Sequence, residues 1–229
     1  EISLGLVGSE MCIRDRSRPL NFIMERGQKI ALVGTNGIGK TTLLKSILGL
    51  IPALKGNCER GENLELGYFE QEVKGENKTT CIEELWQEFP SFSQYEVRSA
   101  LAKCGLTTKH IESQVRVLSG GEQAKVRLCK LVNRDTNILL LDEPVSGLDP
   151  KVTAELYGLI ERLNREDGIT ILMISHDIAA SLRYASHILH IGDAVFFGTK
   201  QAYLESPQGQ LFRSGNCLLY TSPSPRDRG

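Results

Sequence analysis

Apolar residues along the chain gather into short runs. The segments between these runs mix apolar and polar residues. The runs are residues 29–33 (KIALV), 137–141 (NILLL) and 170–174 (TILMI). A strand that is apolar at every position suits a parallel sheet covered on both faces. Between the last two runs, residues 152–164 carry apolar side chains at the spacing of an amphipathic helix. Strands that alternate with helices predict an α/β fold with a mostly parallel, doubly wound sheet.

A glycine-rich segment follows the first apolar run. Residues 34–41 (GTNGIGKT) match the G-x-x-x-x-G-K-[ST] template of a phosphate-binding loop, and residues 41–48 have the pattern of the helix that should follow it. In such a loop the glycines let backbone N–H groups face a phosphate, the lysine reaches the terminal phosphates, and the next hydroxyl can ligate Mg²⁺. The candidate nucleotide-binding residues are Gly34, Thr35, Asn36, Gly37, Gly39, Lys40, Thr41 and Thr42. Thr41 is also a candidate metal ligand.

Two carboxylates stand at the end of the second apolar run. In the sequence NILLLDEP, Asp142 ends the expected strand and Glu143 follows it. Asp142 suits Mg²⁺ binding through water, and Glu143 is placed to polarise a water that attacks a terminal phosphate. His176 follows the third run in the same way and is expected to contact that phosphate and orient the water. The carboxyl ends of parallel strands share one edge of the sheet, where open α/β sheets bind ligands.

A second candidate anion site lies at residues 118–123 (LSGGEQ), ahead of a helix expected over residues 123–133. A serine and two glycines at a helix start leave N–H donors and the positive end of the helix dipole open to an anion. Taken alone, the same pattern also describes an ordinary helix cap with a flexible lead-in. The candidate residues are Ser119, Gly120, Gly121 and Glu122.

The motifs follow one another in an order that resembles a known family. GTNGIGKT, the Gln71 of GYFEQ, LSGGEQ, LLLDEP, GLD and SHD occur as in the ATP-binding cassette (ABC) ATPases, over residues 17 to about 212. The resemblance implies a P-loop NTPase core with a small antiparallel β part and a helical subdomain inserted at about residues 72–117. It implies ATP and Mg²⁺ as ligands and ATP hydrolysis as the activity.

The resemblance also implies roles for single residues. Thr41, Gln71 and Asp142 would surround Mg²⁺. Glu143, His176 and Gln71 would act at the attacking water, with Gln71 linking the site to the helical subdomain. LSGGEQ would cap ATP bound to a second cassette, with Asp149 near that interface. The expected partner is therefore a second cassette, as a homodimer or in tandem.

The resemblance to subfamilies changes along the chain. Residues 17–141 resemble the second cassette of the F subfamily, translation factors that act on the ribosome. Residues 145–213 resemble the ATP-binding subunit of a zinc or manganese importer, which docks a membrane permease. The change falls at LLLDEP, which both families share, so an assembly chimera of two genes is one interpretation and natural recombination is the other. The three hypotheses are an importer subunit, a ribosome-associated factor and a non-functional chimeric reading frame.

The two ends of the chain are expected to be foreign to this domain. Residues 6–16 (LVGSEMCIRDR) translate one strand of an oligonucleotide whose other strand, read one base out of frame, encodes residues 217–226 (CLLYTSPSPR). That DNA resembles a transposase-type sequencing-library adapter. Residues 1–16 and 217–229 are therefore interpreted as adapter-derived tails, and residues 17–216 as the nucleotide-binding domain.

Two usual features of a cassette are expected to be missing. ABC cassettes stack adenine on an aromatic residue in an early strand, and no aromatic lies between residues 1 and 21. Base stacking contributes about 1 to 3 kcal/mol in nucleic-acid sites, so its loss predicts weaker nucleotide binding. Loss of the first strands predicts an unpaired sheet edge.

Composition limits the domain number, the class of ligand and the cellular compartment to be expected. The chain has 229 residues, 41% of them apolar, and a formal net charge of -1, which suits one globular domain without bulk attraction to polyanions. No basic patch interleaved with aromatics predicts a direct nucleic-acid site. The apolar runs are far shorter than the roughly 20 residues of a membrane span. Six cysteines without a C-x-x-C pair favour a reduced compartment, so we expect a cytoplasmic protein, peripheral to the membrane if it serves a transporter.

Overall fold

A six-stranded sheet forms the centre of the computed structural model, which describes residues 4–13, 16–52, 58, 61–70 and 78–213. Its strands are β3 (Lys29–Gly34), β4 (Leu66–Phe69), β5 (Ile138–Leu141), β6 (Thr170–Ile174), β7 (His187–Ile191) and β8 (Phe196–Thr199). Their order is β4-β5-β6-β3-β7-β8, and only β8 runs antiparallel to its neighbour. Every residue of β5 and β6 is buried, as expected for apolar runs in a sheet covered on both faces.

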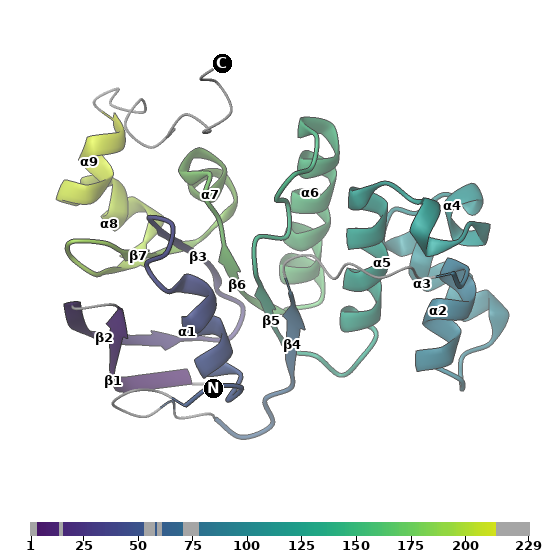
Figure 1. The fold of residues 1–229 in the computed structure, drawn as a ribbon, viewed down its shortest axis with the longest axis horizontal. Helices are drawn as coiled ribbons and strands as arrows, with labels where there is room; N and C mark the ends of the chain where they lie inside the picture. Colours follow the sequence, from purple (N-terminus) through teal and green to yellow (C-terminus); the bar gives the residue numbers. More distant parts are fainter. Residues whose placement is uncertain (1–3, 14–15, 53–57, 59–60, 71–77, 214–229) are drawn as a thin grey trace, which may run out of the picture.

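Helices cover both faces of this sheet (Figure 1). They are α1 (Lys40–Ile47), α5 (Gly120–Val132), α6 (Pro150–Glu166), α7 (Ile178–Tyr184), α8 (Lys200–Glu205) and α9 (Pro207–Arg213). Successive strand residues face opposite sides, so Ile138 and Leu140 of β5 pack in one core cluster with α1. Leu139 and Leu141 pack in the other cluster with α5 and α6. The alternation along β5 fixes which helix the next residue, Asp142, will face.

The N-terminal segment forms an antiparallel hairpin beside the main sheet. Its strands are β1 (Leu4–Ile13) and β2 (Arg16–Met24), paired from Leu4 opposite Met24 to Ile13 opposite Arg16. Leu20, Phe22 and Met24 alternate along β2 and are buried in the cluster that contains α1. The sequence predicts no partner strand for β2, whereas β1 pairs with one of its edges, with an irregularity between Leu6 and Ser9.

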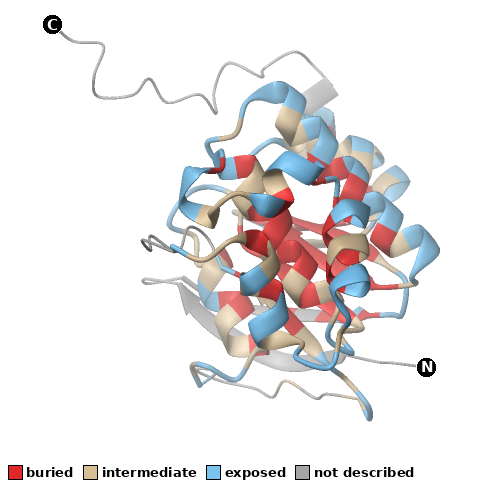
Figure 2. Cartoon of the chain, turned by 90° about the vertical axis from the view of Figure 1, so that its right-hand side faces the viewer, coloured by how far each residue is buried: buried red, intermediate tan, exposed pale blue. Residues whose placement is uncertain are grey.

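A group of short helices lies between β4 and α5 in the chain and forms one end of the molecule (Figure 1). It contains α2 (Cys81–Glu88), α3 (Gln94–Lys103), α4 (Thr108–Glu112) and the 3₁₀ turn η1 (Val115–Val117). Both α2 and α3 begin with a reciprocal Ser/Thr-to-Glu capping box, at Thr80 with Glu83 and at Ser93 with Glu96. Seen from this end, the exposed residues lie on the outer sides of these helices (Figure 2). The predicted subdomain at about residues 72–117 is helical from residue 81 onward.

The element boundaries follow the prediction with one clear correction. The sequence predicts a helix from residue 123 after LSGGEQ, whereas α5 begins at Gly120. Ser119 and Glu122 form a capping box there, which stabilises the first turn although it contains two glycines. In the described part of the chain, every helix is too short or too polar to span a lipid bilayer.

Candidate nucleotide-binding site

The loop between β3 and α1 needs its glycines for two physical reasons. A side chain at Gly34 would collide with the backbone carbonyl of Ile191 on the neighbouring strand β7. Gly39, the residue before α1, has a φ of 101°, in the left-handed region that favours glycine. Because Gly39 has no side chain to cap the helix, the first N–H groups of α1 remain available to a ligand. The arrangement is that of an anion site at a helix N-terminus.

Lys40 folds back over this loop. Its side chain is buried, and Nζ donates to the carbonyl oxygens of Gly34 at 2.8 Å and Thr35 at 3.0 Å. Burial lowers the pKa of Lys40, and the nearby carboxylates of Glu143 and Asp142 partly oppose that shift. The ammonium group is therefore held between the loop and the two acids, where it can meet a phosphate.

Asp142 continues the alternation of β5 and faces α1. The carboxylate is almost fully buried, with 1% of the residue exposed. Thr41 Oγ1 donates to its Oδ1 at 3.1 Å, and Tyr68 Oη donates to its Oδ2 at 3.2 Å. Burial raises the pKa of Asp142, while these two hydrogen bonds oppose the rise. A threonine hydroxyl beside a carboxylate offers the hard oxygen ligands that Mg²⁺ prefers, so the donor set fits that ion.

Glu143 turns away from the strand with an unusual backbone conformation. Its φ is 49°, in the left-handed region that residues with a side chain seldom adopt. His176, which follows β6, contacts Glu143 through Nε2 and Oε1. Strained backbone of this kind persists where the surrounding structure enforces it and is frequent at functional sites. The turn brings the acid and the imidazole together at the carboxyl edge of the sheet.

These residues converge on one pocket of about 420 Å³. It is lined by Asn36, Gly37, Gly39, Lys40, Thr41, Thr42, Glu143 and His176. Asp142 lies directly behind Thr41, and the carbonyls of Gly34 and Thr35 hold the lysine. The loop, the strand-end acids and the histidine therefore meet as the sequence predicted. Gln71 lies outside the described residues.

Sequence reasoning overlooked Tyr68. The residue stands in the GYFEQ segment that carried the prediction for Gln71, but nothing in the pattern points to its hydroxyl. The contact depends on the pairing of two strands that are far apart in the sequence: β4 pairs with β5 so that Tyr68 lies opposite Leu140, two residues before Asp142. Burial and the charge of Asp142 raise the pKa of Tyr68, so the hydroxyl keeps its proton and remains a donor.

The LSGGEQ residues lie apart from this pocket. Ser119 caps α5. The Ser119 N–H donates to Glu122 Oε2 at 2.8 Å, and the Glu122 N–H donates to Ser119 Oγ at 3.4 Å. Glu122 also pairs with His110 of α4 at 3.1 Å. Figure 1 shows α5 and α1 on opposite sides of α6. Within one chain, the structure does not bring Ser119, Gly120, Gly121 or Glu122 to the lining of the described pocket.

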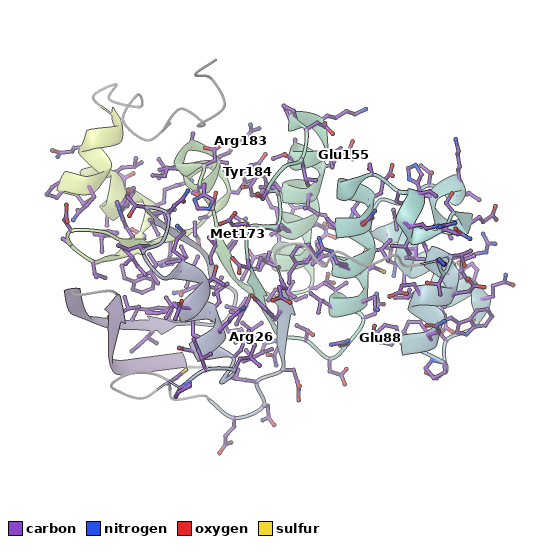
Figure 3. The ribbon with its side chains drawn as sticks, viewed as in Figure 1. Arg26, Glu88, Glu155, Met173, Arg183 and Tyr184 are labelled. Carbon is purple, nitrogen blue, oxygen red and sulfur yellow. The ribbon has the colours of Figure 1, made fainter. Side chains whose placement is uncertain are left out.

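The start of α5 is packed tightly against α6. A side chain at Gly121 would overlap Val152 of α6. Lys125 Nζ donates to Glu155 Oε2 at 2.7 Å, and Figure 3 shows Glu155 on α6 beside α5. At the head of α6, Asp149 caps the helix: Oδ1 accepts from Lys151 N at 3.0 Å and Val152 N at 3.1 Å. The LSGGEQ residues and Asp149 therefore belong to one rigidly joined pair of helix ends.

A comparison of sequences identifies the family. A family model described as "ABC transporter" matches residues 17–146, more than half of the chain. The chain belongs to the ABC transporter family. A second family model, for an AAA domain, matches residues 116–182 of the same cassette.

Curated relatives of this ABC cassette are ATP-binding proteins. It is 66% identical over 161 residues to "Uncharacterized ABC transporter ATP-binding protein YfmM" of Bacillus subtilis, an alignment that covers 70% of the chain and 30% of YfmM. It is 31% identical over 190 residues to the zinc import ATP-binding protein ZnuC of Chromohalobacter salexigens, over 82% of the chain and 79% of ZnuC. The cassette thus spans about 30% of the length of its Bacillus subtilis relatives, YfmM and the ATP-binding protein YdiF.

Solved structures share the fold. An ABC transporter assigned to the metal-chelate type, in an inward-facing conformation, superposes with a TM-score of 0.79 at 20% identity, over 92% of this chain and 88% of that one. The ATP-binding cassette MJ0796, dimeric and bound to ADP and Pi, superposes with a TM-score of 0.66 at 20% identity, over 86% and 98%. The predicted α/β fold with a mostly parallel sheet and a small antiparallel part is confirmed.

The cap at Asp149 gives a first testable prediction. Asp149→Ala removes the acceptor for two N–H groups at the start of α6, so the free energy of unfolding should fall by about 1 kcal/mol. Asp149→Asn keeps an equally good cap and should retain most of that stability. Urea unfolding followed by circular dichroism measures both. An alanine variant as stable as the unsubstituted chain would contradict a capping role.

Proposed function

We propose that this cassette binds and hydrolyses MgATP, as the ATP-binding subunit of an ABC transporter of metal importer type. The observation that carries the proposal is the convergence of Lys40, the Thr41–Asp142 pair and Glu143 on one pocket at the carboxyl edge of the sheet. Such a pocket combines an anion-binding helix start, a buried cation, oxygen ligands for a metal and a candidate base.

The proposed chemistry is hydrolysis of the terminal phosphate. The loop N–H groups and Lys40 bind and orient the phosphates. Thr41 and Asp142, with Gln71 as the further ligand implied by the family, would hold Mg²⁺, which would neutralise part of the phosphate charge. Glu143 accepts a proton as a water oxygen attacks the γ-phosphorus and the bond to the β–γ bridging oxygen breaks. The contact with His176 keeps the carboxylate of Glu143 directed into the pocket.

The site is proposed to be completed by a second cassette. The LSGGEQ residues lie apart from the pocket of their own chain, so the start of α5 can meet a triphosphate only in another copy. MJ0796, which has the same fold, is dimeric in its solved structure with ADP and Pi. Two copies related by a two-fold axis would form two such sites, each with the loop of one chain and LSGGEQ of the other, and Asp149 beside the contact.

Three further proposals concern the role of the whole protein to which this cassette belongs. The identity to zinc import ATP-binding proteins supports an importer subunit at the cytoplasmic face of a membrane, with α2–α4 docked on a permease. A second candidate, a ribosome-associated F-subfamily factor, is favoured by the higher identity to YfmM, of which this chain spans only 30%. A relative of that length has room for another cassette. A chimera of the two, with adapter-derived tails at residues 1–16 and 217–229, is the third candidate.

The role proposed for Glu143 predicts a separation of binding from turnover. Glu143→Gln removes the base but keeps the shape of the side chain, so ATP affinity should remain while the hydrolysis rate falls about 10² to 10⁴-fold. Phosphate release and equilibrium ATP binding measure the two quantities. Glu62→Gln, the same change at an exposed acid, serves as the control and should leave both unchanged. Hydrolysis by Glu143→Gln at the unsubstituted rate would overturn the assignment.

The composite site predicts rescue between two inactive variants. Lys40→Ala removes the ammonium group that binds phosphate in the loop. Gly120→Asp places a carboxylate where LSGGEQ would meet the ATP phosphates of the other chain, and an acid is tolerated at the start of a helix. Each variant alone should be inactive. Mixed chains should recover about a quarter of the original rate, because half of random pairs are mixed and each mixed pair has one intact site. A mixture as inactive as its components would rule out a site shared between chains.

The origin of the chain can be tested at the DNA level. If the gene is natural, long sequencing reads of the source genome should run without a break across the codons for residues 139–147. If the two tails derive from an adapter, the reads should continue beyond the codons for residues 17 and 216 into sequence unlike the adapter. A chimera predicts that no single read joins the two halves. A continuous read with residues 1–16 and 217–229 in place would contradict the chimera and the adapter interpretation together.

A further inference from the structure

The phenol of Tyr68 reaches the candidate metal site from the neighbouring strand. Parallel pairing sets Tyr68 opposite Leu140, so Asp142 lies two residues, or roughly 6.6 Å, further along the strand direction. Both residues fall on the sheet face that α1 covers, and Tyr68 packs against the apolar cluster there together with Leu66. A phenylalanine would fill the same apolar position. The hydroxyl is therefore not needed for packing, and its hydrogen bond to Asp142 calls for another explanation.

The two hydrogen bonds at Asp142 hold its two oxygens separately. Tyr68 Oη donates to Oδ2 at 3.2 Å, and Thr41 Oγ1 donates to Oδ1 at 3.1 Å. Since one donor binds each oxygen from a different side, the carboxylate cannot rotate about its Cβ–Cγ bond without losing a charge-assisted hydrogen bond. Oδ1 is thereby kept toward the Thr41 hydroxyl, the second proposed ligand.

The strand that carries Tyr68 is anchored from two directions. Arg127 of α5 lies 4.3 Å over the ring of Phe69 and donates to the carbonyl of Glu70 at 3.1 Å. Lys45 of α1 pairs with the Glu70 carboxylate at 3.7 Å. The end of β4 is therefore joined to the helix of the phosphate-binding loop and to the helix of LSGGEQ. These contacts, of which the Arg127 hydrogen bond and ring contact are the closer, help to keep the Tyr68 donor in position.

We propose that Tyr68 is a positioning residue for the metal, whose hydroxyl orients the Asp142 carboxylate for Mg²⁺ in the nucleotide complex. The proposal rests on the proposed function, because it presumes that Thr41 and Asp142 hold Mg²⁺ with ATP. Partners that bind a metal's ligands from behind fix the orientation of those ligands, and their removal typically lowers metal affinity about 10 to 100-fold. Tyr68 has the position and chemistry of such a partner.

The test replaces Tyr68 by phenylalanine and measures metal binding directly. Mn²⁺ serves as the probe in place of Mg²⁺, and electron paramagnetic resonance reports free and bound Mn²⁺ in the presence of a non-hydrolysable ATP analogue. Tyr68→Phe should weaken Mn²⁺ binding about tenfold or more. Affinity for the same analogue in EDTA, without metal, should be unchanged. Tyr95→Phe makes the same chemical change at a residue that is 80% exposed, and should alter neither quantity.

Each other outcome has a definite meaning. Unchanged Mn²⁺ affinity in Tyr68→Phe overturns the positioning role. An equal loss of metal-free analogue binding, or a chain that no longer folds by circular dichroism, also overturns it, because the hydroxyl then supports the fold as a whole. Failure of the unsubstituted protein to bind Mn²⁺ with the analogue would instead contradict the proposed function, and so separates the two claims.

Discussion

The site depends on a buried carboxylate at the end of a strand that is apolar throughout. Asp142 follows four fully buried residues, and the alternation of β5 directs it toward α1, where Thr41 donates to it at 3.1 Å. A buried charge is costly unless it is hydrogen-bonded, so this pair constrains how the loop helix sits on the sheet. Lys40 directly precedes Thr41 in the chain, so the same hydrogen bond between Thr41 and Asp142 also restricts the position of Lys40.

The candidate phosphate-binding features are divided between two parts of the chain. The loop and the acids belong to the central sheet, whereas LSGGEQ begins α5, which is packed on α6 and on the short helices. Lys130 of α5 pairs with Glu84 and Glu88 of α2, at 2.6 and 3.0 Å, and Figure 3 shows Glu88 on the side of the short helices that faces α5. One set of contacts therefore joins LSGGEQ to the α2–α4 group and another joins the loop to the sheet. This division is what a site shared between two copies requires.

Much of the fold and most of the pocket could be predicted from the sequence, because they depend on local patterns. Apolar runs marked β3, β5 and β6, and the loop template marked Lys40 and Thr41. Contacts set by pairing between distant strands could not be predicted: the bond from Tyr68 to Asp142 requires the β4–β5 register. The hairpin formed by β1 was missed because the interpretation of residues 1–16 as foreign left no partner for β2. The helix α5 begins three residues before the predicted residue 123, because the Ser119–Glu122 capping box stabilises a first turn that contains two glycines.

The central claim is that one nucleotide and one metal occupy the pocket between the loop and the strand-end acids. A crystal structure of the protein with Mn²⁺ and a non-hydrolysable ATP analogue tests it most directly, since manganese gives an anomalous signal. The account predicts a single anomalous peak between Thr41 Oγ1 and the Asp142 carboxylate, with the terminal phosphate against Lys40 Nζ. An analogue bound elsewhere, or a peak remote from Thr41 and Asp142, would contradict it.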